Sequence, residues 1–249
     1  MVLAIDAGNT TLKVGLWDGD RFSAILRRPT DSDLSPQALQ TWLATSLGTA
    51  PQIEDAVCCS VVPHLDESLH ALSFGTPLRF LRSAVEVGLV SVYEPPGTLG
   101  ADRLANAWGA LQIVAPPVVV VDFGTATKLD AVDADRVYRG GSILPGLAMS
   151  AQMLAEGTAQ LPAVPIEIPD HAIGRSTQES LQSGVVLAHI AAVSGLLRRF
   201  AQEMLGPKPT VVSTGGLGAM FKSLEEFDPV YLPNLTLDGL IAFAKHPRS

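Results

Sequence analysis

The sequence contains one motif twice, and this repetition is its most restrictive feature. An apolar run that ends in Asp-x-Gly and continues as a second apolar run occurs around Asp6 and again around Asp122. Such a pattern is typical of a β-hairpin in which glycine permits a tight turn and backbone N–H groups lie beside a carboxylate. A single copy would be weak evidence of function. Two copies predict a duplicated chain with one such turn in each half.

Both turns carry groups that bind phosphates. Backbone amides contact phosphate oxygens, and an aspartate can hold hydrated Mg²⁺ or another cation. Two hairpins that face each other would therefore hold a nucleotide polyphosphate from both sides. Lys13 could reach a phosphate as a point charge, and the alternative is a solvated strand lysine. The glycine-rich turn 214–218 joins a strand to a helix, which lets a base or sugar lie against the backbone.

Composition narrows the class of protein. A net charge of −8 and a pI near 5.0 disfavour a nucleic-acid-binding surface. Cys58 and Cys59 are neighbours in an expected strand, so they point to opposite faces, which disfavours a disulfide or a shared metal. Unpaired cysteines and no recognisable signal peptide predict a cytoplasmic protein. The apolar run at 113–121 contains two prolines and is too short to cross a membrane.

Strands and helices alternate in the same order in both halves. We therefore expect a duplicated α/β fold of two lobes, residues 1–115 and 116–249, with a central cleft. A capping box, Ser176 with Glu179, begins a long helix with an apolar stripe. This helix either packs inside the monomer or mediates a dimer. The expected strands are 2–6, 12–17, 22–28, 56–61, 78–81, 118–122, 127–131, 136–143 and 210–213. The expected helices are 35–47, one after Pro63, 102–114, one after Pro145, 177–200, one after Gly216, and 235–244.

A proline- and glycine-rich loop, residues 93–101, leads into a helix that begins with Asp102 and Arg103. From local sequence alone, Asp102 is explained more simply as a helix N-cap. It could also accept a proton from a substrate hydroxyl, with Arg103 binding an acid group nearby. The helix N-terminus keeps such a carboxylate ionised. The five histidines show no metal-ligand spacing, and His189 is better explained as a core residue. No Walker lysine loop occurs, which excludes the P-loop route to phosphoryl transfer.

Taken together, these motifs resemble those of type III pantothenate kinases, members of the acetate kinase, sugar kinase and actin superfamily. The resemblance covers nearly the whole chain and implies an actin-like (ribonuclease H-like) ATPase fold. It also implies ATP-dependent phosphorylation of pantothenate to 4′-phosphopantothenate, the first step of coenzyme A synthesis. The shared motifs are Asp6-x-Gly8-Asn9-Thr10, Ser60–Pro63, Tyr93, Gly100–Arg103 with Asn106, Asp122-x-Gly124-Thr125-Ala126, Gly140–Gly146, Thr158–Pro162, Gly174–Gly184 and Thr214–Gly216.

The resemblance also implies residue roles and partners. Asp102 matches the proton acceptor, and Asp122 matches the ligand of a monovalent cation, K⁺ or NH₄⁺. The family acts as a homodimer, and its members use ATP with Mg²⁺, which Asp6 would help to bind. The expected nucleotide-binding residues are Asp6, Ala7, Gly8, Asn9, Thr10, Thr11, Leu12, Lys13, Thr125, Gly215 and Gly216. The expected pantothenate-binding residues are Tyr93, Gly100, Ala101, Asp102, Arg103 and Thr177.

One position departs from the family pattern. Its second hairpin commonly reads Gly-Thr-Ala-x-Thr, and the final threonine is here Lys128. Lys128 either forms a surface ion pair with Asp130 or places its ammonium near Asp122, where it could replace part of the monovalent cation. Two rival functions remain at this point. One is another small-molecule kinase of the same fold, and the other is a non-catalytic accessory regulator.

Overall fold

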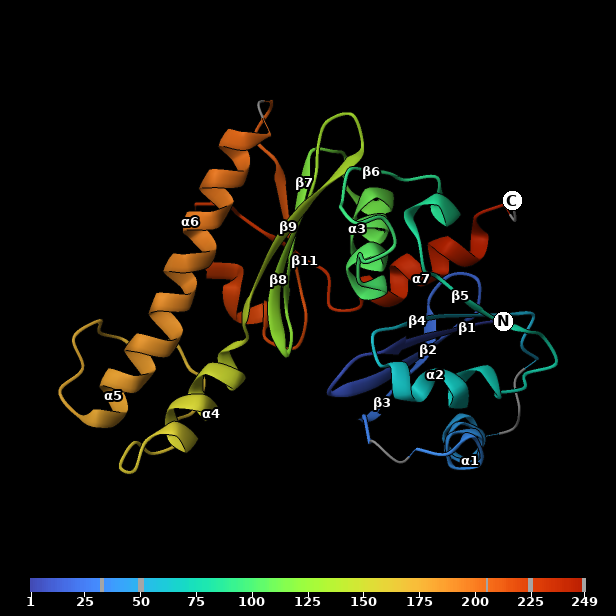
Figure 1. The fold of residues 1–249 in the computed structure, drawn as a ribbon, viewed down its shortest axis with the longest axis horizontal. Coiled ribbons are helices and arrows are strands. Elements are labelled where there is room, and N and C mark those ends of the chain that lie inside the picture. Colours follow the sequence, from blue (N-terminus) through green and yellow to red (C-terminus); the bar gives the residue numbers. More distant parts are fainter. Residues whose placement is uncertain (32–33, 49–51, 205, 224–225, 248–249) are drawn as a thin grey trace. The chain divides into compact units, whose positions relative to one another are not determined.

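The structure is a computed structural model that describes residues 1–31, 34–48, 52–204, 206–223 and 226–247 (Figure 1). The chain forms two compact units. Unit 1 comprises Met1–Ile113 together with Asn234–Ser249, and unit 2 comprises Val114–Pro233. The change of unit after Ile113 lies close to the expected lobe boundary at 115/116. The C-terminal segment differs from the expectation, because it packs in unit 1 and not in the second lobe.

Unit 1 is built on a five-stranded sheet in the order β3-β2-β1-β4-β5. Strands β1, β2 and β3 are antiparallel neighbours, whereas β4 is parallel to both β1 and β5. The strands span Val2–Ala7, Thr11–Trp17, Phe22–Pro29, Asp55–Ser60 and Leu78–Phe80 for β1 to β5. Shorter elements are the 3-10 helix Ala84–Val87 and strand β6, Val90–Ser91.

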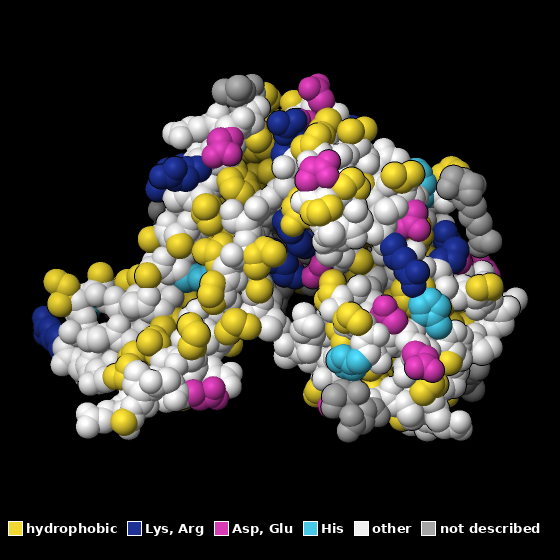
Figure 2. All heavy atoms as spheres, viewed as in Figure 1, with side chains coloured by type: hydrophobic (Ala, Val, Ile, Leu, Met, Phe, Trp, Pro, Cys, Tyr) yellow, Lys and Arg dark blue, Asp and Glu magenta, His cyan; other side chains and the backbone are white. Residues whose placement is uncertain are grey.

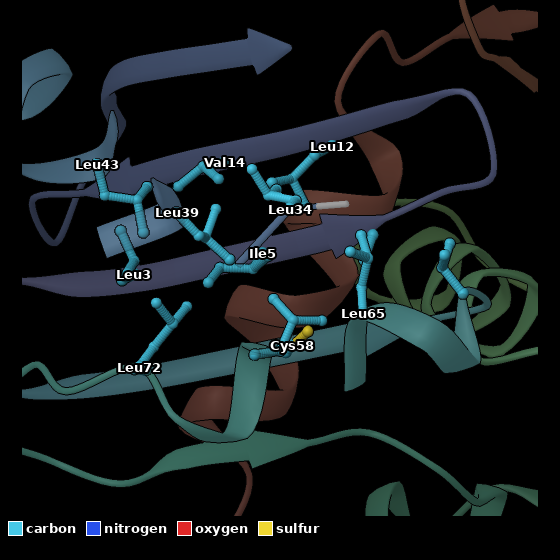
Figure 3. Packing of buried hydrophobic residues seen from close by; sticks show 14 of the residues in the cluster. Leu3, Ile5, Leu12, Val14, Leu34, Leu39, Leu43, Cys58, Leu65 and Leu72 are labelled. Atoms are coloured by element: carbon cyan, nitrogen blue, oxygen red, sulfur yellow. The ribbon is translucent and has the colours of Figure 1, made fainter. Parts of the chain in front are cut away.

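Helices cover both faces of this sheet. α1 (Pro36–Leu47) and α2 (Pro63–His70) lie on one face, and α3 (Ala101–Ile113) and α7 (Leu235–Lys245) lie on the other (Figure 1). Alternating strand residues such as Leu3 and Ile5 point towards α1 and α2 and form a buried core, shown in Figure 3. The opposite face, which carries Asp6 and Lys13, is left for α3 and α7.

Unit 2 repeats this plan. Its strands follow the order β11-β10-β7-β8-β9, with β7, β8 and β9 antiparallel and β10 parallel to β7 and β11. The equivalence of β7-β8-β9-β10 with β1-β2-β3-β4 confirms the duplicated α/β fold. The strands are β7 Val118–Phe123, β8 Ala126–Val132, β9 Val137–Pro145, β10 Thr210–Thr214 and β11 Val230–Tyr231. The helices are α4 Leu147–Gly157, α5 Thr177–Gln182, α6 Ala188–Glu203 and the 3-10 helix Gly218–Ser223.

The long helix expected at 177–200 is interrupted. Its capping box is present in part: Ser176 Oγ accepts a hydrogen bond from Glu179 N at 3.2 Å. A π-helical segment, Ser183–Leu187, then separates α5 from α6. Taken as one helix, Thr177–Glu203 is long and apolar enough to cross a membrane by length and composition, and it contains an 18-residue window with a mean hydropathy of 1.5. This is weak evidence for a membrane span, because core helices of soluble proteins have the same properties.

Two glycines let α3 and α7 pack with their backbones in contact. A Cβ atom on Gly239 would overlap the carbonyl group of Ala105, and one on Gly109 would lie 2.9 Å from Leu235 O. Thr236 Oγ1 also donates to Asn106 Oδ1 at 2.8 Å across the same pair of helices. The last helix of the chain is therefore locked onto the helix that carries Asp102.

We expect Gly239→Ala to destabilise the protein by about 1–3 kcal/mol or more, because the added methyl group overlaps a backbone carbonyl that cannot rotate away. Urea unfolding monitored by circular dichroism measures this loss. Gly195→Ala in α6 is the matched control, since its Cβ would meet no atom within 4 Å. This control should be neutral or stabilising by about 0.4–1 kcal/mol. Equal stability of the two variants would contradict the close α3–α7 packing.

Candidate active site

The first Asp-x-Gly turn connects β1 to β2 as expected. Gly8 N donates to Thr11 O at 3.2 Å, which closes the turn. Thr30 holds it from the neighbouring strand end: its Oγ1 donates to Gly8 O at 2.6 Å, and its N donates to Thr10 O at 3.0 Å. Asn9, Thr10 and Thr11 are exposed. The turn is therefore anchored by its carbonyl groups and presented at the surface of unit 1.

Strand register places Lys13 of β2 directly opposite Asp6 of β1. In unit 2 the same register places Lys128 of β8 directly opposite Asp122 of β7. Residues directly opposite each other on antiparallel strands have Cβ atoms about 4.5–5.5 Å apart. Each hairpin therefore pairs a lysine with its aspartate. The difference in turn length conceals this equivalence in the sequence.

The Asp122–Lys128 pair is formed in the structure. Lys128 Nζ lies 3.1 Å from Asp122 Oδ2, and the two side chains are only 17% and 14% exposed. Asp130 is fully buried, and its Oδ1 accepts a 2.5 Å hydrogen bond from the Tyr138 hydroxyl. An exposed Lys128–Asp130 pair is therefore excluded, and the expectation that the ammonium reaches Asp122 is confirmed.

The glycine-rich turn after β10 lies beside the second hairpin. Thr214 pairs with Asp122 across the parallel strands β10 and β7. Gly215, which follows Thr214, has φ +87°, and a Cβ there would lie 2.7 Å from Asp122 Oδ1. Only glycine fits this backbone conformation and spacing. Gly216 has open space around it, with no atom within 4 Å of a Cβ position. Unit 2 thus brings Asp122, Lys128 and the glycine turn together.

The loop before α3 forms a second cluster in unit 1. Asp102 lies in the first turn of α3, not at the N-cap position, and its Oδ1 accepts a hydrogen bond from Arg103 N at 2.8 Å. Arg103 is only 4% exposed, and its Nη1 donates to the Tyr93 hydroxyl at 3.2 Å. A Cβ on Gly100 would lie 2.8 Å from Asp102 Oδ1, so glycine makes room for the carboxylate.

Cys59 interacts with Asp6 and, more weakly, with Asp102. Cys59 Sγ is 3.7 Å from Asp6 Oδ1, as expected from the parallel register that pairs the two residues. Burial raises the pKa of the Cys59 thiol well above its ordinary value, and the negative charges of Asp6 and, more weakly, Asp102 add to this increase. The thiol therefore stays protonated and can donate to Asp6. Sequence reasoning treated Cys59 as a core residue only, although the pairing of β1 with β4 would have revealed the contact.

Two other expected site residues, Thr177 and Thr125, lie in the helix start and the hairpin turn that the sequence predicts for them. Thr177 begins α5 in unit 2 and is exposed, and Thr125 is exposed in the turn of the second hairpin. No group of three or more His, Cys, Asp or Glu side chains that could hold a metal occurs in the described part of the chain.

His189 supports the second hairpin from behind, a role that the sequence did not indicate. Its Nε2 lies 2.9 Å from Thr127 Oγ1 of β8, and the side chain is 8% exposed. Phe123 and Phe221, stacked with their ring centroids 3.7 Å apart, pack beside it. Burial lowers the pKa of His189, so the imidazole is neutral near pH 7.

We expect acidification to destabilise the protein through His189. Because its pKa is lower in the folded state, the unfolded chain binds the proton more readily. The free energy of unfolding should decrease as the pH drops below 6.5, the ordinary pKa of histidine. The decrease should end once the pH lies below the lower pKa of the folded state. The wild type should lose more stability than His189→Gln over this window, as measured by thermal unfolding. His171→Gln, at an exposed histidine, is the control; identical pH profiles of wild type and His189→Gln would refute this expectation.

The sequence matches a known protein family over most of its length. The family model described as type III pantothenate kinase matches residues 2–199. The type III pantothenate kinase of Thermomicrobium roseum is 39% identical over 251 residues, covering 96% of this chain and 95% of that protein. The one from Agathobacter rectalis is 36% identical over 250 residues, covering 96% and 95%.

Solved structures show the same fold. A Campylobacter jejuni protein described as a Baf family transcriptional activator has a TM-score of 0.65 at 21% identity, covering 98% of this chain and 97% of that one. A Sinorhizobium meliloti protein described as a 2-dehydro-3-deoxygalactonokinase has a TM-score of 0.60 at 15% identity, covering 98% of both chains. At these identities the likeness shows only the actin-like fold. The family match and the full-length relatives show more: this chain belongs to the type III pantothenate kinase family.

Proposed function

We propose that the protein transfers the γ-phosphoryl group of ATP to the primary hydroxyl of pantothenate and forms 4′-phosphopantothenate, the first step of coenzyme A synthesis. The observation that carries this proposal is the Tyr93–Arg103–Asp102 cluster at the start of α3, in a chain of this family. In pantothenate the primary hydroxyl is phosphorylated, and the single carboxylate has to be bound. The cluster offers a carboxylate for the first and a guanidinium for the second.

Asp102 acts as the proton acceptor in this proposal. Its hydrogen bond from Arg103 N fixes the orientation of the carboxylate in the first turn of α3. In phosphoryl transfer the base mainly orients the hydroxyl and takes its proton late, and a carboxylate can perform both tasks. Arg103 binds the pantothenate carboxylate and is itself positioned by the Tyr93 hydroxyl. Gly100 and Ala101 complete the acceptor site, and Thr177 is a further pantothenate contact.

The two hairpins bind the nucleotide. We assign Asp6 to Lys13 and Thr125 to the phosphates of ATP, and Gly215 with Gly216 to the adenosine. Members of this kinase family use ATP with a divalent cation. Mg²⁺ usually keeps several waters and binds through one or two carboxylates and the substrate phosphates, so a single Asp6 carboxylate beside turn amides fits it. Mg²⁺ held by Asp6 would neutralise charge on the phosphates, and Lys13, directly opposite Asp6 on β2, would add a second positive charge there.

A separate monovalent cation fits the second hairpin less well than Mg²⁺ fits the first. Lys128 Nζ already lies 3.1 Å from Asp122 Oδ2, in a pair that is mostly shielded from solvent. We propose that this ammonium supplies the charge for which relatives use K⁺ or NH₄⁺. Two like charges about 4 Å apart repel by roughly 4 kcal/mol at an effective dielectric near 20, so the lysine and a separate cation would compete.

We also propose that the protein is a homodimer in the cytoplasm. Exposed apolar side chains gather on α4 and on the segment that follows it, as Figure 2 shows at the lower left. Exposed apolar side chains that gather in one region are typical of a protein interface, and a second copy would cover them symmetrically. The residues are Met149, Met153, Leu154, Ile168 and Ile173. The free thiols of Cys58 and Cys59 suit a reducing compartment.

A product assay tests the proposed activity directly. Purified protein is incubated with Mg·ATP and a panel of acceptors, namely pantothenate, a hexose and acetate, and the products are identified by mass spectrometry. The proposal requires 4′-phosphopantothenate as the dominant product. Phosphorylation of another acceptor instead would identify a different small-molecule kinase. No transfer to any acceptor, with ATP bound, would favour an accessory regulator.

We expect Asp102→Asn to reduce kcat by about 10²- to 10⁴-fold, because the variant keeps the shape of the carboxylate and loses its ability to accept a proton. Nucleotide affinity and thermal stability should change little. Asp66→Asn is a matched control, since Asp66 is also an acidic residue in the first turn of a helix, α2. A variant Asp102→Asn that keeps more than about a tenth of the wild-type kcat would limit Asp102 to a structural role.

For Lys128→Thr we expect activity that depends strongly on K⁺, whereas the wild type should respond weakly. The reason is that removal of the ammonium leaves Asp122 without its 3.1 Å partner and opens the position to a cation. The measurement is kcat/KM for ATP over a K⁺ series in buffer free of Na⁺ and NH₄⁺. Lys208→Thr, at an exposed lysine of unit 2, is the control. Equal and strong activation of wild type and Lys128→Thr would rule out the replacement of K⁺ by Lys128.

Ile173→Glu and Met153→Glu should weaken the proposed dimer by at least about tenfold in Kd, because each places a charge in the apolar surface of unit 2. Sedimentation equilibrium over a concentration series measures this change. Val85→Glu is the matched control, since Val85 in unit 1 is 84% exposed and Ile173 is 85% exposed. A monomeric wild type, or dissociation by Val85→Glu alone, would place the interface elsewhere or remove it.

A further inference from the structure

The motif Ser60–Pro63 connects the end of β4 to the start of α2 in unit 1. The proposed reaction assigns no task to it. The parallel register of β1 and β4 places Ser60 beside Ala7, the residue before Gly8 of the first phosphate turn. Val61 N, one residue later, donates to Ala7 O at 3.1 Å. The backbone of the motif is therefore bonded to the phosphate turn.

The side chain of Val61 lies beside the acceptor loop. Its Cγ1 is 3.8 Å from the position that a Cβ atom on Gly100 would occupy. Asp102 Oδ1 is 2.8 Å from the same position. Val61 therefore lies between two parts of the site: its backbone contacts the phosphate turn, and its side chain faces the glycine that makes room for the carboxylate of Asp102.

The hydroxyl of Ser60 joins this segment to α2. Ser60 Oγ donates to Asp66 Oδ1 at 2.7 Å and accepts from Val62 N at 3.2 Å. Asp66 lies in the first turn of α2, and the N-cap residue Val62 makes no side-chain capping bond. A hydrogen bond from a hydroxyl to a carboxylate is stronger than one between neutral groups. The Ser60–Asp66 bond therefore links the end of the strand firmly to the helix.

The partner that Asp66 offers is held in place by the core. Val62, Leu65 and Leu69, which flank Asp66 along the chain, are at most 2% exposed and belong to the buried cluster of unit 1. Helix α2 is thus anchored on the sheet independently of Ser60. Its first turn presents a fixed acceptor, against which the Ser60 hydroxyl can set the path of the chain through Val61.

We propose that Ser60 and Asp66 are positioning residues: their hydrogen bond fixes Val61, and Val61 sets the spacing between the phosphate turn and the loop that carries Asp102. This inference rests on the proposed transfer to pantothenate. In-line transfer requires the phosphoryl group and the acceptor hydroxyl to be aligned. A displacement of about 1 Å that originates far from the reacting atoms can reduce the rate about 10²-fold. Neither residue has to touch a substrate to act in this way.

The first test separates kcat from nucleotide binding. Ser60→Ala removes the hydroxyl and should reduce kcat by about 10- to 100-fold. The Kd of Mg·ATP, measured by calorimetry without acceptor, should change by less than about threefold, because the groups that bind the phosphates remain. Ser60→Thr keeps the hydroxyl, so its kcat should stay within about threefold of the wild-type value.

Variants of the partner show whether the two residues act together. Asp66→Ala should reproduce the loss of kcat seen in Ser60→Ala. The double variant should lose no more than either single variant, because both changes break the same bond. Asp66→Asn retains an acceptor oxygen for the Ser60 hydroxyl and should remain active.

Ser35→Ala is the control for helix stability. It removes the same kind of hydroxyl at another helix start of unit 1, where Ser35 Oγ accepts from Ala38 N at 3.2 Å at the N-cap of α1. The change should lower thermal stability, as the loss of a capping side chain usually does, and leave kcat unchanged. A loss of kcat through weaker folding alone would appear in this variant too.

Methyl NMR tests the geometry without the reaction. The sample is deuterated protein with protonated valine methyl groups and protonated glycine. A nuclear Overhauser cross-peak should join a Val61 methyl group, assigned by its loss in Val61→Ala, to the α-protons of Gly100, because the carbon atoms are close. This cross-peak should persist in Ser60→Thr and Ser35→Ala and weaken in Ser60→Ala.

The outcomes distinguish this inference from the proposed activity. A wild type that forms no 4′-phosphopantothenate refutes the proposed activity, and the positioning role falls with it. Full kcat in Ser60→Ala, beside an active wild type, refutes the positioning role alone. An equal loss in Ser35→Ala, no recovery in Ser60→Thr, or additive losses in the double variant would refute it as well. So would reduced kcat in Ser60→Ala with an unchanged cross-peak, since Val61 would then not have moved.

Discussion

The cross-strand pairing of a lysine with an aspartate at each hairpin is the constraint on which the site depends. Antiparallel register places Lys13 opposite Asp6 and Lys128 opposite Asp122. A half-buried carboxylate is costly without a compensating charge, and the lysine supplies that charge before any nucleotide binds. The lysine can also turn its ammonium towards phosphate oxygens. Each hairpin thus combines turn amides, a carboxylate and a cation within one pair of strands.

The acceptor side of unit 1 depends on a different constraint, the packing of α3 against α7. Gly109 and Gly239 allow the two helices to touch through their backbones, and Asn106 is held by Thr236. Since Asp102 and Arg103 lie in the first turn of α3, their positions are set by a helix that comes more than a hundred residues later in the chain. The position of the Asp102 cluster therefore depends on the packing of the C-terminal helix α7.

Cys59 interacts with the carboxylates of both Asp6 and Asp102. It lies next to Asp6 in the parallel register of β1 and β4, and Asp102 is near enough to raise its pKa. A protonated thiol can donate to Asp6 without adding charge, so it orients the carboxylate without competing with a cation. The neighbouring Cys58, one residue earlier on β4, points to the opposite face and packs in the core. Adjacent cysteines thus serve different purposes because strand residues alternate.

The sequence by itself determined the duplicated α/β plan, most strand and helix positions, the two Asp-x-Gly turns and the family. These follow from local patterns: apolar periodicity, glycine at tight turns and capping residues such as Ser176. Tertiary structure alone decided that α7 returns to unit 1, that Lys128 pairs with Asp122, and that Cys59 and His189 support the hairpins. Each of these depends on which distant segments pack together, and strand register and helix packing are set by the summed burial of the whole unit. No local pattern contains that information.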